Sequence, residues 1–213
     1  MQIQTITTAT IPGYRIYEYL LVVSPHKELC DKIMEVKAKF ADVYECEQAR
    51  LGKPQLLLAN FVQYEMMQER LVNRLRIVSM GTTPFKIELR DFGSFPSHTV
   101  YINVVTKVQV QNLVKAIRHE SQKLMKLNDD NKPHFILEPH LTIARKLQPW
   151  QYEKGWLEYQ HANFHGRFIA DHALLLKRKA GEYYKEVGKF MFEGMKEEVT
   201  QTELFAPALK GVK

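Results

Sequence analysis

The sequence contains little cysteine and no long apolar run. Its 213 residues include two cysteines, Cys30 and Cys46, which are too few and too far apart for a zinc site or a disulfide framework. No stretch approaches the roughly eighteen uncharged apolar residues of a membrane span, and residues 1–12 lack a basic segment followed by an apolar one. These absences argue against a membrane-spanning, exported or disulfide-stapled protein, and we expect a reduced, cytoplasmic chain.

Low-complexity linkers are also absent, so we expect one domain over residues 1–213. With 45% hydrophobic residues, a chain of this length can bury a full core, as one unit or as two small lobes. We expect a loose leader at 1–13 and a loose polar tail at 194–213. The net charge of +6 favours anionic ligands such as nucleotides or RNA, although it is also ordinary for a cytoplasmic enzyme.

Apolar residues follow strand and helix periods in turn along the chain. Strands are predicted where β-branched and aromatic residues alternate with polar ones, and helices where apolar residues recur every three or four positions. The predicted strands are residues 16–23, 55–61, 85–90, 99–105, 139–145, 168–178 and 183–192. The predicted helices are one capped by Ser24, then 63–78, 108–127 and a segment from Pro149. This order predicts an α+β fold with mostly antiparallel strands.

One short strand carries a pair of residues suited to phosphate chemistry. In Pro139-His140-Leu141-Thr142-Ile143-Ala144-Arg145, alternation places His140 and Thr142 on one face, with Leu141 and Ile143 behind them. An imidazole can give or take a proton near neutral pH, and a hydroxyl can hold a phosphate oxygen. The pair therefore points to phosphodiester chemistry, although a His-x-Thr pattern by itself is a weak motif.

A second segment repeats the pattern of this strand. Lys53-Pro54-Gln55-Leu56-Leu57-Leu58-Ala59 and Glu138-Pro139-His140-Leu141-Thr142-Ile143-Ala144 share a proline, a polar residue, an apolar-rich run and an alanine. Such an echo predicts two related half-domains whose equivalent strands lie across a shared cleft. We therefore expect two pseudo-symmetric lobes, with flanking helices, around a central cleft.

Together these features resemble the two-histidine phosphoesterase superfamily, most closely its bacterial 2'-5' RNA ligase branch, the RNA 2',3'-cyclic phosphodiesterases. In that family each lobe contributes a strand with a His-x-Thr/Ser pattern, and the two histidines flank the phosphodiester. The resemblance runs from LLVVSP at 20–25, through Pro139–Arg145, to FIADHALLLKR at 168–178. It implies that His140 and Thr142 are catalytic.

The first motif departs from the family pattern, because Gln55 and Leu57 stand where the resemblance places histidine and threonine. In the family, one histidine acts as general base on the attacking water or hydroxyl, and the other protonates the leaving oxygen. An amide does neither, and a positioned acid or base is typically worth about a hundredfold to ten-thousandfold in rate. The sequence therefore leaves open whether the chain is an enzyme.

Five further residues are candidates for binding phosphate or nucleotide. Gln55 can donate an amide hydrogen bond to a phosphate oxygen, and Lys53, two residues earlier on the same strand face, can supply a charge. Tyr101 faces outward on its strand and can stack a base, while His98 can reach the mouth of the cleft. Arg145 points away from the motif histidine if the strand stays regular, so a structural ion pair competes with a phosphate contact. The other four have plain alternatives as tolerated, solvated or packed side chains.

Three functions stay open. The first is a 2'-5' RNA ligase-like or cyclic phosphodiesterase-like hydrolase that acts on RNA ends or nucleotide phosphodiesters through the intact motif. The second is a pseudoenzyme that binds the same ligands without turnover, and an interaction domain that keeps only the fold is a third. No cofactor is expected. No metal is expected either: His161 and His165 have the i, i+4 spacing of a helical metal site, but Asn163 and Gly166 indicate that this segment is a loop.

Overall fold

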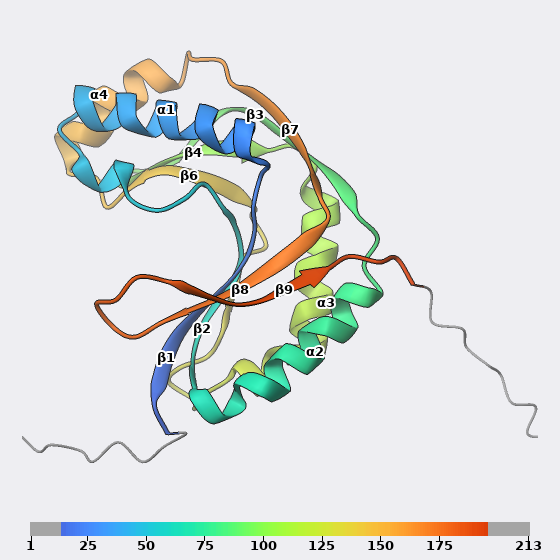
Figure 1. Ribbon diagram of the computed structural model, residues 1–213. Coiled ribbons are helices and arrows are strands. Elements are labelled where there is room, and N and C mark those ends of the chain that lie inside the picture. Colours follow the sequence, from blue (N-terminus) through green and yellow to red (C-terminus); the bar gives the residue numbers. More distant parts are fainter. Residues whose placement is uncertain (1–13, 196–213) are drawn as a thin grey trace, which may run out of the picture.

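The structure is a computed structural model that describes residues 14–195. The expected leader lies outside the described residues, as does all of the expected tail except residues 194 and 195. Figure 1 shows the elements in chain order, and a 3-10 turn precedes β2 and another precedes α2. The elements are β1 (Ile16–Val23), α1 (Lys27–Val43), η1 (Glu47–Arg50), β2 (Leu56–Tyr64), η2 (Glu65–Met67), α2 (Gln68–Met80), β3 (Phe85–Phe95), β4 (Thr99–Val104), α3 (Lys107–Met125), β5 (His134–Phe135), β6 (His140–Arg145), α4 (Pro149–Tyr159), β7 (His165–Ala170), β8 (His172–Arg178) and β9 (Lys185–Met191).

The strands form two sheets, and all paired strands are antiparallel. Sheet A has the order β5-β2-β1-β8-β9, and sheet B has the order β6-β4-β3-β7. The predicted α+β class with two lobes of antiparallel strands and flanking helices is confirmed. No helix within residues 14–195 combines the length and apolarity needed to cross a membrane.

The two sheets exchange one helix each. Helix α1 follows β1 of sheet A but packs against β6 and β7 of sheet B, whereas α3 follows β4 of sheet B but packs against β2 of sheet A. In Figure 1, α1 and α4 accordingly lie beside sheet B, and α2 and α3 beside sheet A. We call the helix-covered side of each sheet its closed face and the other side its open face. The side chains on the closed faces join one hydrophobic core.

Two helix starts differ from the prediction. Helix α1 begins at Lys27 with His26 as N-cap, so the cap predicted at Ser24 is wrong. The second helix begins at Gln68 rather than 63, because β2 stays paired with β1 up to Tyr64. Gln63 belongs to this strand and is buried, where its side-chain amide donates to the carbonyls of Leu124 and Lys126 at 2.7 and 3.1 Å. Its position in the sheet therefore outweighs the helical pattern of the residues after it.

Two strand boundaries also differ. The run predicted as one strand over 168–178 is divided at Asp171 into β7 of sheet B and β8 of sheet A. The strand predicted to end at residue 90 continues to Phe95. At Asp91 the backbone adopts a left-handed conformation (φ 51°) and the β3–β4 register shifts, but the pairing resumes after this residue. Asp91 is held by its backbone N–H, which donates to the carbonyl of Phe164 at 2.8 Å. A bulge of this kind shifts the side-chain alternation, so the pattern no longer looks like a strand.

Candidate active site

Strand β6 presents the intact motif on the open face of sheet B. Leu141 and Ile143 are buried on the closed face, and His140 and Thr142 are half-buried on the open one. Alternation of side chains along a strand accounts for this arrangement, as the sequence predicts. The neighbouring strand β4 places Asn103 opposite His140, Tyr101 opposite Thr142 and Thr99 opposite Arg145.

Arg145 lies on the same face as His140, contrary to the prediction for a regular strand. The β4–β6 register shifts between Val100 and Tyr101, so that Ile143 is an extra residue on β6. Ile143 and Ala144 are consequently both buried, and Arg145 returns to the open face, where it is exposed. A bulge re-aims the side chains that follow it. The bulge therefore adds a guanidinium to the face that carries His140 and Thr142.

The His140 imidazole lies between two aromatic rings and a backbone carbonyl. Its ring centroid is 4.9 Å from that of Phe95, edge to face, and 4.9 Å from that of Tyr101. Its Nδ1 lies 2.8 Å from the carbonyl oxygen of Glu138. A carbonyl only accepts hydrogen bonds, so Nδ1 carries the proton and the neutral ring keeps a free lone pair on Nε2. The ring is thus held in the tautomer that can accept a proton through Nε2.

Burial lowers the pKa of His140 below its ordinary value of 6.5, and the Glu138 carbonyl and carboxylate oppose this shift. The cause is loss of solvent around the charged imidazolium beside the Phe95 and Tyr101 rings. A lowered pKa keeps the ring neutral at physiological pH. The environment therefore favours a general base or a neutral hydrogen-bonding group over a standing cation.

Gly93 on β3 makes room for this cluster. It lies opposite Tyr101 in the β3–β4 pairing. A Cβ atom at this position would lie 2.6 Å from Asn103 Oδ1 and 2.6 Å from the Tyr101 ring, closer than side chains approach one another. The missing side chain thus allows the Tyr101 ring to lie across β3 toward Phe95, whose ring centroid is 4.7 Å away.

Strand β2 repeats the geometry of β6 on the other sheet. From Gln55 to Asn60, and again from His140 to Arg145, the side chains are in turn half-buried, buried, half-buried, buried, buried and exposed. The β1–β2 register also shifts, which makes Leu58 the extra residue on β2. The predicted echo between the two segments is therefore present in their structure, bulge included.

The first motif position carries an amide in place of a titratable ring. The Gln55 side-chain nitrogen lies 3.4 Å from the hydroxyl oxygen of Ser24, at the end of β1. Leu57 is opposite Val22 on β1 and gives this face no hydroxyl. Strands β2 and β6 contact each other although they belong to different sheets, so the two motif strands are neighbours.

A buried lysine holds the loop that leads into β2. Lys37 on α1 is 5% exposed, and its ammonium donates to the carbonyls of Leu51 and Gly52 at 3.0 and 2.8 Å. Burial, and to a smaller extent the nearby Arg145 guanidinium, lowers the pKa of Lys37. The loop before the first motif is thereby fastened to α1, close to the end of β6, and the predicted candidate Lys53 lies exposed in it.

The remaining predicted residues lie around this face or away from it. His98 is exposed next to the Arg145 end of the face, with its Nδ1 2.6 Å from the Thr99 hydroxyl. His165 begins β7, whereas His161 follows α4, so the two do not share a helix. Among residues 14–195, no three His, Cys, Asp or Glu side chains gather closely enough to hold a metal ion.

Two members of the cluster were not predicted as site residues. Phe95 lies beyond the strand predicted at residues 85–90, and the bulge at Asp91 hides the strand pattern that would have included it. Asn103 lies in the strand predicted at residues 99–105, but its residue type gives no sign of a role at the site. Counting back from His140 along a paired strand would have found it, but the register of that pairing is not readable from one sequence.

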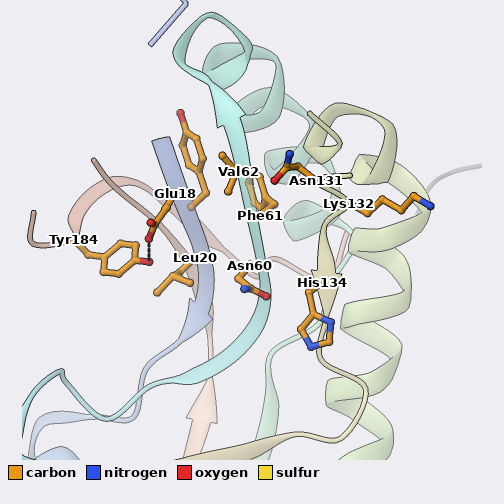
Figure 2. Close-up of a pocket in the computed structure, with 10 residues that line it drawn as sticks. Glu18, Leu20, Asn60, Phe61, Val62, Asn131, Lys132, His134 and Tyr184 are labelled. Atoms are coloured by element: carbon orange, nitrogen blue, oxygen red, sulfur yellow. Dashed lines mark hydrogen bonds between the residues drawn. The ribbon is translucent and has the colours of Figure 1, made fainter. Parts of the chain in front are cut away.

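The open face of sheet A carries a separate hollow of about 210 Å³ (Figure 2). Leu20 and Asn60, which are paired across β1 and β2, lie on its floor. Tyr184 lies on one side, with its hydroxyl 3.4 Å from the Glu18 carboxylate, and Lys132 and His134 lie on the other. Asn60 occupies the place on β2 that Arg145 occupies on β6. The hollow therefore lies next to the first motif, farther along β2.

Comparison with known proteins identifies a family and solved structures that are similar to this chain. Residues 25–182, more than half of the chain, match the family described as the 2'-5' RNA ligase superfamily. No curated protein sequence matches the chain. The structure of E. coli LigT complexed with 3'-AMP is 13% identical with a TM-score of 0.62, and the match covers 84% of this chain and 99% of that one.

Two further solved structures share the fold. A protein of Thermus thermophilus is 18% identical with a TM-score of 0.58, over 83% of this chain and 98% of that one. E. coli LigT complexed with NADP+ is 15% identical with a TM-score of 0.58, over 84% and 99%. The repeated motif strand, the two sheets and the family match agree, and the chain belongs to the 2'-5' RNA ligase superfamily.

Proposed function

We propose that the chain binds the phosphodiester of a 2',3'-cyclic nucleotide or RNA end at the open face of β6 and hydrolyses it slowly. The observation that carries the proposal is the environment of His140, a neutral imidazole with a free Nε2 on the face that it shares with Thr142 and Arg145. Solved structures of E. coli LigT with 3'-AMP and NADP+ support a nucleotide as ligand.

Each residue has a role in this proposal. His140 Nε2 takes a proton from water as the water oxygen attacks phosphorus. The Thr142 hydroxyl donates to a phosphate oxygen, and Arg145 offsets its negative charge. Gln55, directly before the first residue of β2, donates an amide hydrogen bond but no proton. The bond from phosphorus to the ribose 2' or 3' oxygen then breaks, and that oxygen takes its proton from solvent.

The missing acid predicts a low rate. A positioned general acid is worth about a hundredfold to ten-thousandfold, so we expect turnover lower than that of a two-histidine site by such a factor. The second candidate function, binding without turnover, is favoured by Leu57 and by the contact of Gln55 with Ser24, which leave β2 without a titratable group at the motif.

Turnover and binding of a 2',3'-cyclic mononucleotide test both candidates. We expect hydrolysis by the wild type that is lost in His140→Ala, kept in His119→Ala on α3, and raised at least tenfold in Gln55→His. Binding that depends on His140 without hydrolysis would support the second candidate. If the wild type neither binds nor hydrolyses the nucleotide, both are wrong and only the fold relates this chain to its family.

A further inference from the structure

A row of side chains crosses the open face of sheet B from the motif histidine. The strand register places His140 opposite Asn103, Asn103 opposite Arg90, and Arg90 opposite His165 on the edge strand β7. Neighbouring strands are about 4.8 Å apart, so Arg90 lies roughly 10 Å across the sheet from His140. Arg167, two residues after His165, shares this face.

This part of the face is hollowed and positively charged. The hollow has a volume of about 290 Å³. Arg90 and Arg167 are exposed, and neither forms an ion pair with any residue in the described range 14–195. The acidic residue here, Glu88, is paired with Lys86 at 2.6 Å. The hollow is lined by Glu88, Leu89, Arg90, His165, Gly166 and Arg167.

Three other arginines of the structure, Arg50, Arg74 and Arg178, each pair with carboxylates. Arg90 and Arg167 keep their guanidiniums free although Glu88 is close enough for both to lower its pKa, after the larger effect of Lys86. Unpaired guanidiniums held by a rigid sheet are suited to phosphate, which they can contact with two parallel hydrogen bonds.

We propose that Arg90 and Arg167 form a track for the phosphate backbone of single-stranded RNA whose cyclic-phosphate end lies at His140. The inference rests on the proposed function, which it extends from a nucleotide to a strand. Tyr101 and Phe95 lie beside His140 next to the track and offer aromatic surface for a base. Contacts to phosphate carry no sequence information, so the track selects strand length rather than sequence.

The competing path runs over sheet A. Its hollow is lined by Glu18, but Arg178 pairs with that carboxylate, and Lys132 is the cation on its opposite side (Figure 2). One lysine supplies less charge than the two arginines of sheet B. An RNA strand that ends at His140 is therefore expected to follow sheet B.

The test compares a short single-stranded RNA ending in a 2',3'-cyclic phosphate with a 2',3'-cyclic mononucleotide, by binding at several salt concentrations. In Arg90→Gln/Arg167→Gln, we expect RNA affinity at low salt to fall at least tenfold. Removing one phosphate contact lowers the slope of log K against log salt by about 0.7 for single strands, so the slope should fall by about 1.4. Mononucleotide affinity should stay within about threefold. The matched control is Arg70→Gln/Arg76→Gln on α2, which removes the same charge from the closed side of sheet A.

The outcomes separate this inference from the proposed function. If the wild type binds the mononucleotide through His140 but the sheet B variant binds RNA like the control, the track is wrong and the proposed function stands. The track is also wrong if Lys132→Gln lowers the salt slope and the arginine variant does not. If the wild type binds neither ligand, both proposals fail.

Discussion

At the scale of single residues, three neighbours decide what His140 can do. The Glu138 carbonyl selects the tautomer, and Phe95 and Tyr101 remove water from around the ring. Burial disfavours the imidazolium, so protonation of His140 is shifted to lower pH. The same imidazole on an exposed strand would titrate near its ordinary value and would be partly charged at neutral pH.

Truncating Phe95 should raise the pKa of His140. Phe95→Ala exposes one side of the ring to water, so we expect the pKa, followed by NMR of the imidazole, to move toward 6.5. Phe85→Ala, on the same strand but stacked on Phe192, is the control and should leave it unchanged. An unshifted pKa in Phe95→Ala would show that the aromatic contact does not set it.

His140 should also make stability depend on pH. Its folded pKa is below the unfolded value of 6.5, so its contribution is present above about pH 6.5 and is lost as pH falls through the folded pKa. The difference in free energy of unfolding between wild type and His140→Gln, measured by urea titration, should therefore shrink toward acid pH. A difference that grows toward acid pH would mean that the folded pKa is raised.

Gly93 is needed for close packing rather than for a special backbone angle. Gly93→Ala places a Cβ 2.6 Å from both Asn103 and Tyr101, so we expect a loss of about 1–3 kcal/mol in the free energy of unfolding. In Gly81→Ala, the nearest atom would lie at 3.8 Å, and stability should not fall. Equal effects in urea titration would contradict this role of Gly93.

At the scale of elements, bulges in β2 and β6 decide which residues share a face. Each inserts one apolar residue, Leu58 or Ile143, and so returns Asn60 or Arg145 to the open face. The loop before β2 is also fixed in place, because the Lys37 ammonium on α1 donates hydrogen bonds to two carbonyl oxygens of this loop. Both features determine where the motif side chains lie without touching a ligand.

Removing the Lys37 ammonium should loosen the loop before Gln55. Lys37→Met leaves the carbonyls of Leu51 and Gly52 without their donor, and we expect the free energy of unfolding to fall by about 1–3 kcal/mol. Lys39→Met, on the same helix, breaks only an exposed ion pair with Glu158 and should change it by less than about 1 kcal/mol. Similar losses for both variants in urea titration would contradict the role of Lys37.

At the scale of the whole molecule, each sheet is covered in part by a helix that follows a strand of the other sheet. Helix α1 leaves sheet A and covers sheet B, and α3 does the reverse. Gly166 on β7 allows the approach of α1, because a side chain there would lie 2.7 Å from Leu29. Neither sheet buries its closed face with helices from its own stretch of chain alone.

A core truncation in α1 should therefore destabilise both lobes together. Leu29 is 5% exposed, and Leu29→Ala should lower the free energy of unfolding by about 2–5 kcal/mol in a single transition. Val43→Ala, on the same helix but 53% exposed, should lower it by less than about 0.5 kcal/mol. Fluorescence of Trp150 and Trp156 on α4 should follow the same curve as circular dichroism, and separate curves would mean that the sheets unfold independently.

The sequence by itself was sufficient for the fold class and for the intact motif. Local rules account for both: alternation places His140 and Thr142 on one side of a strand, and the echo between residues 53–59 and 138–144 indicates two related lobes. The presence of Gln55 where the second segment has His140 is likewise visible without a structure, because it follows from comparing the residues of the two repeated segments.

Only the tertiary structure decided which residues surround His140. Two bulges reversed the expected direction of Arg145 and hid the strand that carries Phe95, and the pairing register brought Asn103 and Arg90 into line with His140. A one-residue shift of register moves every later side chain to the other face, and which register forms depends on the partner strand as well as on the strand itself. The site is therefore determined by contacts between strands far apart in the chain, which the local pattern of any one strand does not contain.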